Sequence, residues 1–206
     1  MYARSSTFRG RPDSIDAGIE FVRDEVLPTM LVMDGCIGLS MLANRETGLC
    51  ITTSAWHSLE TRNDSEQQVG ELRAGIGERL GGAPEVDTWE IGLLHRDHWS
   101  REGARVRATW VQTDPAEIDR LVDFTKATTL PTLEEVPGFC SCSVMIDRGT
   151  GKGVVAVSFD TAAAEENSRE MARRLRDRFV HETREQIVDV EQFDLVLAHL
   201  HAAELV

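Results

Sequence analysis

The sequence predicts an α+β protein made of two tandem copies of one β-α-β-β-α-β module. The first observation is an internal repeat. Leu27-Pro28-Thr29 recurs as Leu130-Pro131-Thr132, and Arg45-Glu46-Thr47-Gly48 recurs as Arg148-Gly149-Thr150-Gly151, both at an offset of 103 residues. The second is that runs with strand-like alternation and runs with helical spacing follow one another in the same order in both halves. A repeat at a fixed period indicates repeated structural units.

The ends of the two copies give the domain boundaries. Trp89-Glu90-Ile91-Gly92-Leu93-Leu94-His95 matches Phe193-Asp194-Leu195-Val196-Leu197-Ala198-His199 at an offset of 104. The offset between the two copies changes by single residues along the chain, as insertions in loops would produce. We therefore expect module 1 in residues 1–95, a polar linker in 96–103 and module 2 in 104–206.

In module 1 a helix is expected to begin at Asp13 or Ser14, because these residues precede apolar positions at helical spacing and favour helix starts. Gly81-Gly82 is expected to end the second helix. The predicted order is a helix from 13, a strand near 37–41, a turn at 44–48, a strand at 49–56, a helix through 69–76 and a strand at 86–94.

In module 2, Asp114-Pro115-Ala116-Glu117 has a capping aspartate, a proline at the first helical position and a glutamate placed for a capping box. Leu130-Pro131 is expected to end or bend the resulting helix. The predicted order is a strand at 105–111, a helix from 114, a strand at 138–146, a turn at 147–151, a strand at 153–159, a helix from 167 and a strand at 190–200.

Composition and charge exclude several classes of function. Hydrophobic residues make up 41% of the 206 residues, and the net charge is −13. So acidic a chain lacks the basic surface that binds nucleic acid or an anionic membrane. No apolar run approaches the roughly 20 residues that span a bilayer, and the N-terminus does not have the apolar core of a signal peptide. We therefore expect a cytoplasmic protein with no nucleic-acid or membrane partner.

The four cysteines predict small buried side chains, because Cys140-Ser141-Cys142 does not have the spacing of a paired Cys-x-x-Cys zinc site. No two histidines have zinc-ligand spacing within a helix, and Gly151-Lys152-Gly153 lacks the pattern of a phosphate loop. The sequence therefore predicts no metal ion, haem or flavin.

One local pattern carries a family resemblance. Arg45-x-Thr47-Gly48 is followed by a strand and then by Trp56-His57-Ser58-Leu59-Glu60, with Phe159-Asp160-Thr161 at the corresponding place in module 2. With the order of elements, this pattern resembles the dimeric α+β barrel superfamily, and the antibiotic-biosynthesis-monooxygenase group in particular. The resemblance implies ferredoxin-like modules that pack sheet to sheet. A tandem copy then implies an intramolecular pseudo-dimer, either a monomer or a weak homo-oligomer.

The resemblance leaves two functions open. One is a cofactor-independent monooxygenase, or a related enzyme, that acts on a small aromatic substrate. The other is a relative that binds a small molecule without catalysis or serves only a structural role. Haem-degrading members of the superfamily use an asparagine on the first strand, where this chain has Ser5, Ser6 and Thr7. The resemblance therefore argues against haem degradation.

Five side chains are weak candidates for binding a ligand: Trp56, His57, Arg107, Trp110 and His181. The resemblance implies a pocket between sheet and helices that the aromatic and imidazole groups could line. Each also has a structural interpretation, as core packing for the tryptophans and as surface or helix-end positions for the histidines. Of the two modules, the first is the place where we expect a pocket, because it holds the Trp56-His57 pair.

Arg107 has two interpretations. The apolar positions Val106 and Trp110 alternate with it, and this alternation predicts that Arg107 points away from the helices. It would then join a polar network near Gln192, Asp194 and Glu90, or it would bind an anionic ligand.

Overall fold

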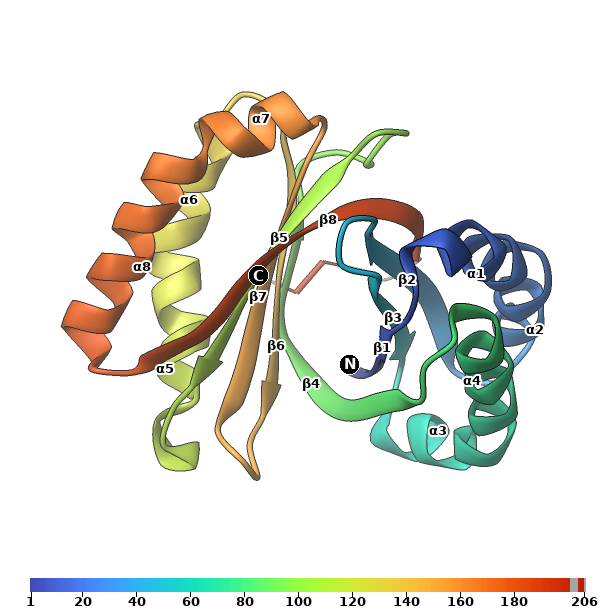
Figure 1. Cartoon of the computed structure of the whole chain (residues 1–206). Helices are drawn as coiled ribbons and strands as arrows, with labels where there is room; N and C mark the ends of the chain where they lie inside the picture. Colours follow the sequence, from blue (N-terminus) through green and yellow to red (C-terminus); the bar gives the residue numbers. More distant parts are fainter. Residues whose placement is uncertain (201–203, 206) are drawn as a thin grey trace. The chain divides into compact units, whose positions relative to one another are not determined.

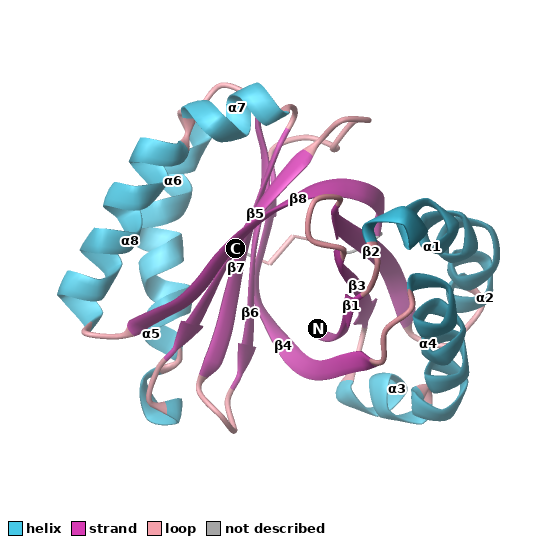
Figure 2. Ribbon diagram, in the orientation of Figure 1, coloured by secondary structure: helices cyan, strands magenta, loops and turns pink. Residues whose placement is uncertain are grey.

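The computed structural model describes residues 1–200, 204 and 205, and its chain forms two compact units (Figure 1). Unit 1 contains Met1–Trp89 and the C-terminal part of the last strand from Phe193, and unit 2 contains Glu90–Gln192. Each unit has strands in one layer and helices in another (Figure 2). None of the described helices is long and apolar enough to span a membrane.

Unit 1 has an antiparallel sheet with helices on one face. β3 pairs with both β1 and β2, and β2 pairs with the end of β8. Its elements are β1 (Tyr2–Arg9), a 3-10 turn (Pro12–Ser14), α1 (Ile15–Phe21), a π-helical segment (Val22–Val26), α2 (Leu27–Leu31), β2 (Cys36–Asn44), β3 (Leu49–Trp56), α3 (Leu59–Asp64), α4 (Glu66–Leu80) and β4 (Pro84–Arg96). The core between the sheet and the helices contains Phe8, Ile15, Met41, Trp56 and Leu80.

Unit 2 repeats this arrangement, with β7 paired to β5 and β6, and β6 paired to the second half of β4. Its elements are β5 (Arg105–Gln112), a 3-10 turn (Pro115–Glu117), α5 (Asp119–Phe124), a π-helical segment (Thr125–Thr129), α6 (Leu130–Glu134), β6 (Phe139–Asp147), β7 (Lys152–Phe159), α7 (Ala162–Asn167), α8 (Arg169–Thr183) and β8 (Gln186–Leu200). Leu93, Leu121, Val144, Phe159 and Phe179 belong to its core.

The strands are hydrogen-bonded in the closed order β1-β3-β2-β8-β5-β7-β6-β4. This order confirms the prediction of two ferredoxin-like modules that form an intramolecular, pseudo-dimeric α+β barrel. The compact units divide within β4 and β8. The boundaries 1–95, 96–103 and 104–206 stay a prediction about the duplicated sequence.

The first long helix of each unit contains a π-helical segment directly before a Leu-Pro pair. The segments are Val22–Val26 before Pro28 and Thr125–Thr129 before Pro131. Proline has no N–H to donate and crowds the preceding turn, so the helix continues only with a local change in its hydrogen-bond register. The repeated Leu-Pro-Thr motif therefore bends the helix without ending it.

A register shift between Ile91 and Leu93 changes which face of β4 each residue occupies. Leu93 belongs to the core of unit 2, whereas the Nε1 atom of Trp89 donates a hydrogen bond to the Ser5 Oγ atom within unit 1 (2.8 Å). Simple alternation along β4 predicts that Trp89 and Leu93 share the helix-facing side; they do not, because strict alternation fails across a β-bulge.

Candidate ligand-binding site

One candidate site is a cavity between the sheet and the helices of unit 2. It encloses about 580 Å³ of space, open solvent at its mouth included. Most of its lining is apolar and comes from β5, β7, α5 and α8; the apolar lining includes Leu121, Phe124, Val155, Val157, Leu175 and Phe179. Thr125 and Thr129 of the π-helical segment also line it. Such a lining suits a ligand with an apolar body.

Arg107 on β5 lies at this cavity and is 4% exposed. Its guanidinium donates hydrogen bonds to the Ser168 Oγ atom (2.8 Å) and the Glu165 carbonyl oxygen (2.7 Å), and it forms an ion pair with the Glu165 carboxylate. Burial lowers the pKa of Arg107, and the charge of Glu165 opposes that shift. These contacts join β5 to α7 and to the start of α8.

The predicted direction of Arg107 is therefore wrong. The structure places it on the helix-facing side of β5 within unit 2, bonded to Glu165 and Ser168. The physical reason is that both faces of β5 are buried. Arg107 is 4% exposed on one face, and Val106 and Ala108 are 4% and 2% exposed on the other. A strand that is buried on both faces gives no alternation signal that identifies the helix-facing side.

Arg176 on α8 brings a second guanidinium to the lining of the same cavity. It is half-buried, and no hydrogen bond or ion pair joins it to any residue that the structure describes. The pKa of Arg176 is lowered, first by burial and then by the positive charge of Arg107. An anion in the cavity would counter both effects, because it would supply the acceptor and the negative charge that Arg176 lacks.

Unit 1 has a corresponding but smaller cavity of about 300 Å³, lined in part by Arg4 and Arg73. Arg4 repeats the contacts of Arg107, since it donates to the Ser65 Oγ atom (3.1 Å) and to the Arg62 carbonyl oxygen. Glu66 forms ion pairs with both arginines, at 2.8 Å to Arg4 and 2.6 Å to Arg73. The two guanidiniums of unit 1 thus share one carboxylate acceptor within the protein.

Three matched positions have larger side chains in unit 1 than in unit 2. Unit 1 has Phe8 and Trp56 where unit 2 has the smaller Val111 and Phe159, and Phe8 and Trp56 are fully buried in the core. Val69 of unit 1 is likewise replaced by an alanine at position 172. The Trp56-His57 pair made module 1 the first place to look for a pocket; of the two cavities, the larger lies in unit 2.

The other four candidates do not line either cavity. Trp56 is buried and donates its Nε1 hydrogen bond to the Ser54 Oγ atom (3.0 Å). His57 is exposed at the end of β3, and His181 is exposed in the last turn of α8. Trp110 lies on the face of β5 opposite Arg107 and Thr109. Their proposed role in ligand binding therefore has no support from the cavity geometry.

Sequence reasoning missed Arg176, Glu165 and Ser168. The signal was present in the repeat, because the polar residues Arg4, Ser65 and Arg73 recur as Arg107, Ser168 and Arg176 at the offset of 103. Polar residues retained at matched positions of a duplicated module indicate a common site, here the cavity between sheet and helices.

The closed strand order and the cavity between sheet and helices define a class of protein: the tandem form of the dimeric α+β barrel. No protein-family model matches the chain. The chain is 43% identical over 206 residues to Uncharacterized protein Rv2557 of Mycobacterium tuberculosis, with all of this chain and 92% of that protein covered. It is also 43% identical over 207 residues to Uncharacterized protein Rv2558, with coverages of 100% and 88%. The chain belongs to the family of these two mycobacterial proteins.

Solved structures of low sequence identity share the fold. A candidate monooxygenase from Lactobacillus acidophilus superimposes with a TM-score of 0.69 and 9% identity, over 97% of this chain and 96% of that one. An anthrone oxidase-like protein gives 0.68 and 13%, over 99% and 94%. The heme-degrading enzyme LmHde of Listeria monocytogenes gives 0.55 and 9%, over 95% and 99%. At these identities the likeness shows the common fold.

Proposed function

We propose that the protein binds a small acidic molecule with an apolar, ring-sized body in the cavity of unit 2. The observation that carries this proposal is Arg176, a half-buried cation that lines an apolar cavity without an acceptor among the described residues. Arg73, at the matched position of unit 1, has Glu66 as its acceptor. The apolar lining would hold the body of the ligand, and Arg176 would bind its anionic group.

The test compares the affinity of an acid with that of its neutral analogue. Naphthoate and naphthamide have the same ring system and differ in charge, so the protein should bind naphthoate more tightly when both displace a fluorescent anilinonaphthalene sulfonate probe. Arg176→Gln should weaken naphthoate binding about tenfold or more, because a hydrogen bond to a charged group is worth about 1.5–3 kcal/mol. Equal affinity for acid and amide would refute the proposal.

Two further variants locate the site. Arg73→Gln makes the same substitution in unit 1 and should leave naphthoate affinity unchanged. Val111→Phe places in unit 2 the residue found at the matched position of unit 1, Phe8, and should abolish binding by filling the cavity. Binding that survives Val111→Phe would place the ligand elsewhere.

A second function, oxygenation of the bound anion, is favoured by the fold shared with an anthrone oxidase-like protein. A guanidinium stabilises the enolate of an aromatic ketone, and such an electron-rich anion is the form that reacts with O₂. The methylene carbon would lose two hydrogens and gain one oxygen atom to become a carbonyl, and the second oxygen atom would leave as water. The lining residues would supply charge and a dry cavity, without a metal ion or flavin.

Oxygen uptake distinguishes the two functions. With anthrone as substrate, an oxygenase should consume one O₂ for each ketone oxidised, and Arg176→Gln should lower kcat/KM while Arg73→Gln does not. If the wild-type protein binds naphthoate but consumes no more O₂ than buffer, the binding function stands and the oxygenase function fails.

A further inference from the structure

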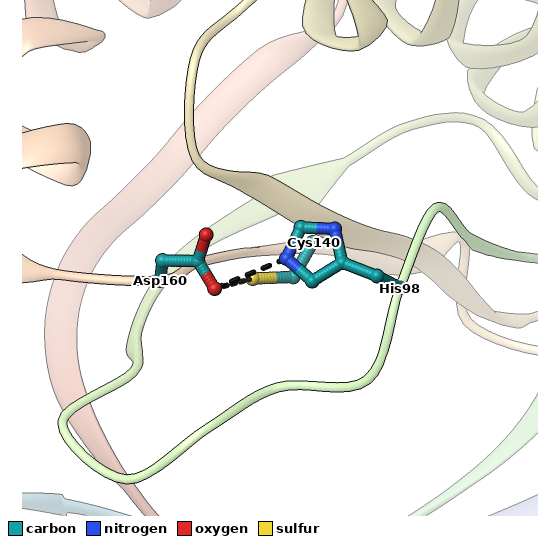
Figure 3. A group of neighbouring side chains, drawn as sticks. All are labelled: His98, Cys140 and Asp160. Atoms are coloured by element: carbon teal, nitrogen blue, oxygen red, sulfur yellow. Dashed lines mark hydrogen bonds and ion pairs between the residues drawn. The ribbon is translucent and has the colours of Figure 1, made fainter.

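Three side chains from distant parts of the sequence meet within unit 2 (Figure 3), and none of them lines the cavity. They are His98 after β4, Cys140 on β6 and Asp160 after β7. One carboxylate oxygen of Asp160 lies 3.0 Å from the His98 Nε2 atom and 3.4 Å from the Cys140 Sγ atom. Imidazole, thiolate and carboxylate are the three ligand types that zinc prefers in proteins.

We propose that His98, Cys140 and Asp160 bind a divalent transition-metal ion such as Zn²⁺. The three ligand atoms all lie within 4.8 Å of one another. Ideal tetrahedral coordination at the usual zinc bond lengths separates such atoms by about 3.3–3.6 Å. Small side-chain rotations would therefore admit the ion. A thiolate and a carboxylate balance its double positive charge, so the occupied site is neutral.

A neighbouring carboxylate supports His98 in this role. The Asp97 carboxylate lies 2.7 Å from the Nδ1 atom of His98. Without the ion both ring nitrogens donate to carboxylates; when the ion replaces the Nε2 proton, the bond to Asp97 would keep the remaining proton on Nδ1 and direct the Nε2 lone pair at the metal. Carboxylate support of this kind is usual for zinc-bound histidine, and its loss typically weakens metal affinity about 10–100-fold.

Backbone hydrogen bonds hold the three segments together without the ion. The amides of Asp97 and His98 both donate to the Cys140 carbonyl oxygen, at 2.8 Å and 3.3 Å. The amide of Asp160 donates to the Gly138 carbonyl oxygen at 2.8 Å. Cys140 is buried, whereas the side chains of His98 and Asp160 are 36% and 33% exposed. The site is therefore preformed and open to an ion that arrives from solvent.

The sequence predicted no metal because spacing rules search for ligands within one segment. His98, Cys140 and Asp160 lie in three segments that come together only in the folded sheet. Unit 1 has Ile37 and His57 at the positions that match Cys140 and Asp160. The same set of ligands is thus not repeated at these positions, and we expect one ion for each chain.

Cobalt is the probe for the test, because thiolate ligation gives Co²⁺ a charge-transfer band and four-coordination gives it intense visible bands. Chelator-treated full-length protein should bind one equivalent of Co²⁺ with both signatures, and Zn²⁺ should displace it. Cys140→Ser should lose the charge-transfer band, and His98→Ala and Asp160→Asn should each weaken binding at least tenfold. Cys36→Ser and His181→Ala are the matched controls and should leave the spectrum and the affinity unchanged.

Asp97→Asn tests positioning, with an expected loss of affinity of about 10–100-fold while the charge-transfer band is kept. Circular dichroism of each variant checks that it is folded. His98→Ala, which removes a partly exposed side chain, tests the proposal if Cys140→Ser does not fold. The proposal is overturned if the wild-type protein binds no Co²⁺ or Zn²⁺ at one equivalent. It is equally overturned if the ligand variants bind as tightly as the controls.

Discussion

Replacing Arg107 with methionine tests the buried ion pair that joins α7 to the sheet of unit 2. The side chains of Arg107 and Glu165 are only 5% and 4% exposed. The substitution leaves the Glu165 carboxylate buried without its cation, and breaking one side of a buried pair typically costs about 3–5 kcal/mol. Since a domain is usually stable by about 5–15 kcal/mol, we expect a large fall in the free energy of unfolding, measured by urea denaturation.

A second arginine provides the matched control. Arg4 also donates to a serine hydroxyl and a backbone carbonyl, but its carboxylate partner, Glu66, is 54% exposed. After Arg4→Met that carboxylate stays in water, so the loss should be smaller, about 1 kcal/mol. The difference between the two losses isolates the cost of leaving a carboxylate buried and unpaired.

A double-mutant cycle completes the test. Replacing Arg107 with methionine and Glu165 with leucine removes both charges, and such paired replacements are often close to neutral. The double variant should therefore recover most of the stability lost in Arg107→Met. A coupling energy near zero, or equal losses for Arg107→Met and Arg4→Met, would refute the reasoning.

Two further predictions concern stability. Glu185 is 8% exposed, neither of its carboxylate oxygens has a partner at good hydrogen-bond geometry among the described residues, and burial raises its pKa more than the nearby Thr113 lowers it. The folded state therefore binds this proton more tightly than the unfolded state does. The contribution of Glu185 to stability falls as the pH rises above its unfolded pKa of about 4.3. Glu185→Gln should stabilise the protein by about 1–3 kcal/mol near neutral pH, and thermal melts in acid should show no such gain. Gly151→Ala should cost clearly more than Gly103→Ala in thermal melts. Both glycines have positive φ, but a Cβ atom at 151 would lie 2.1 Å from a backbone oxygen, whereas one at 103 meets nothing within 4 Å. Equal losses for the two would contradict this account.

The sequence predicted the order of elements because that order depends on local patterns that occur twice. The Leu-Pro-Thr and turn motifs at an offset of 103 align the two modules, and each module repeats the same alternation and helix starts. Repetition converts two weak local signals into one strong signal.

The faces of individual strands were harder to predict. Arg107 was assigned to the wrong face because Val106 and Ala108, its neighbours on the other face, are buried as well. Trp89 was assigned wrongly because a bulge between Ile91 and Leu93 interrupts the alternation. Both errors arise where tertiary structure, which the local pattern does not contain, decides the orientation.

Joining the two modules in one chain allows their sites to diverge. In a dimer of identical subunits every substitution appears in both cavities, whereas here Glu66 of unit 1 is matched by Arg169 in unit 2. Glu66 binds Arg73 within the protein, but Arg169 forms its ion pair with Glu166, which leaves Arg176 without an acceptor among the described residues. Arg73 therefore has a carboxylate acceptor within unit 1, whereas its counterpart Arg176 is the group that we propose binds an anion. The smaller Val111 and Ala172 give the second cavity the room for it.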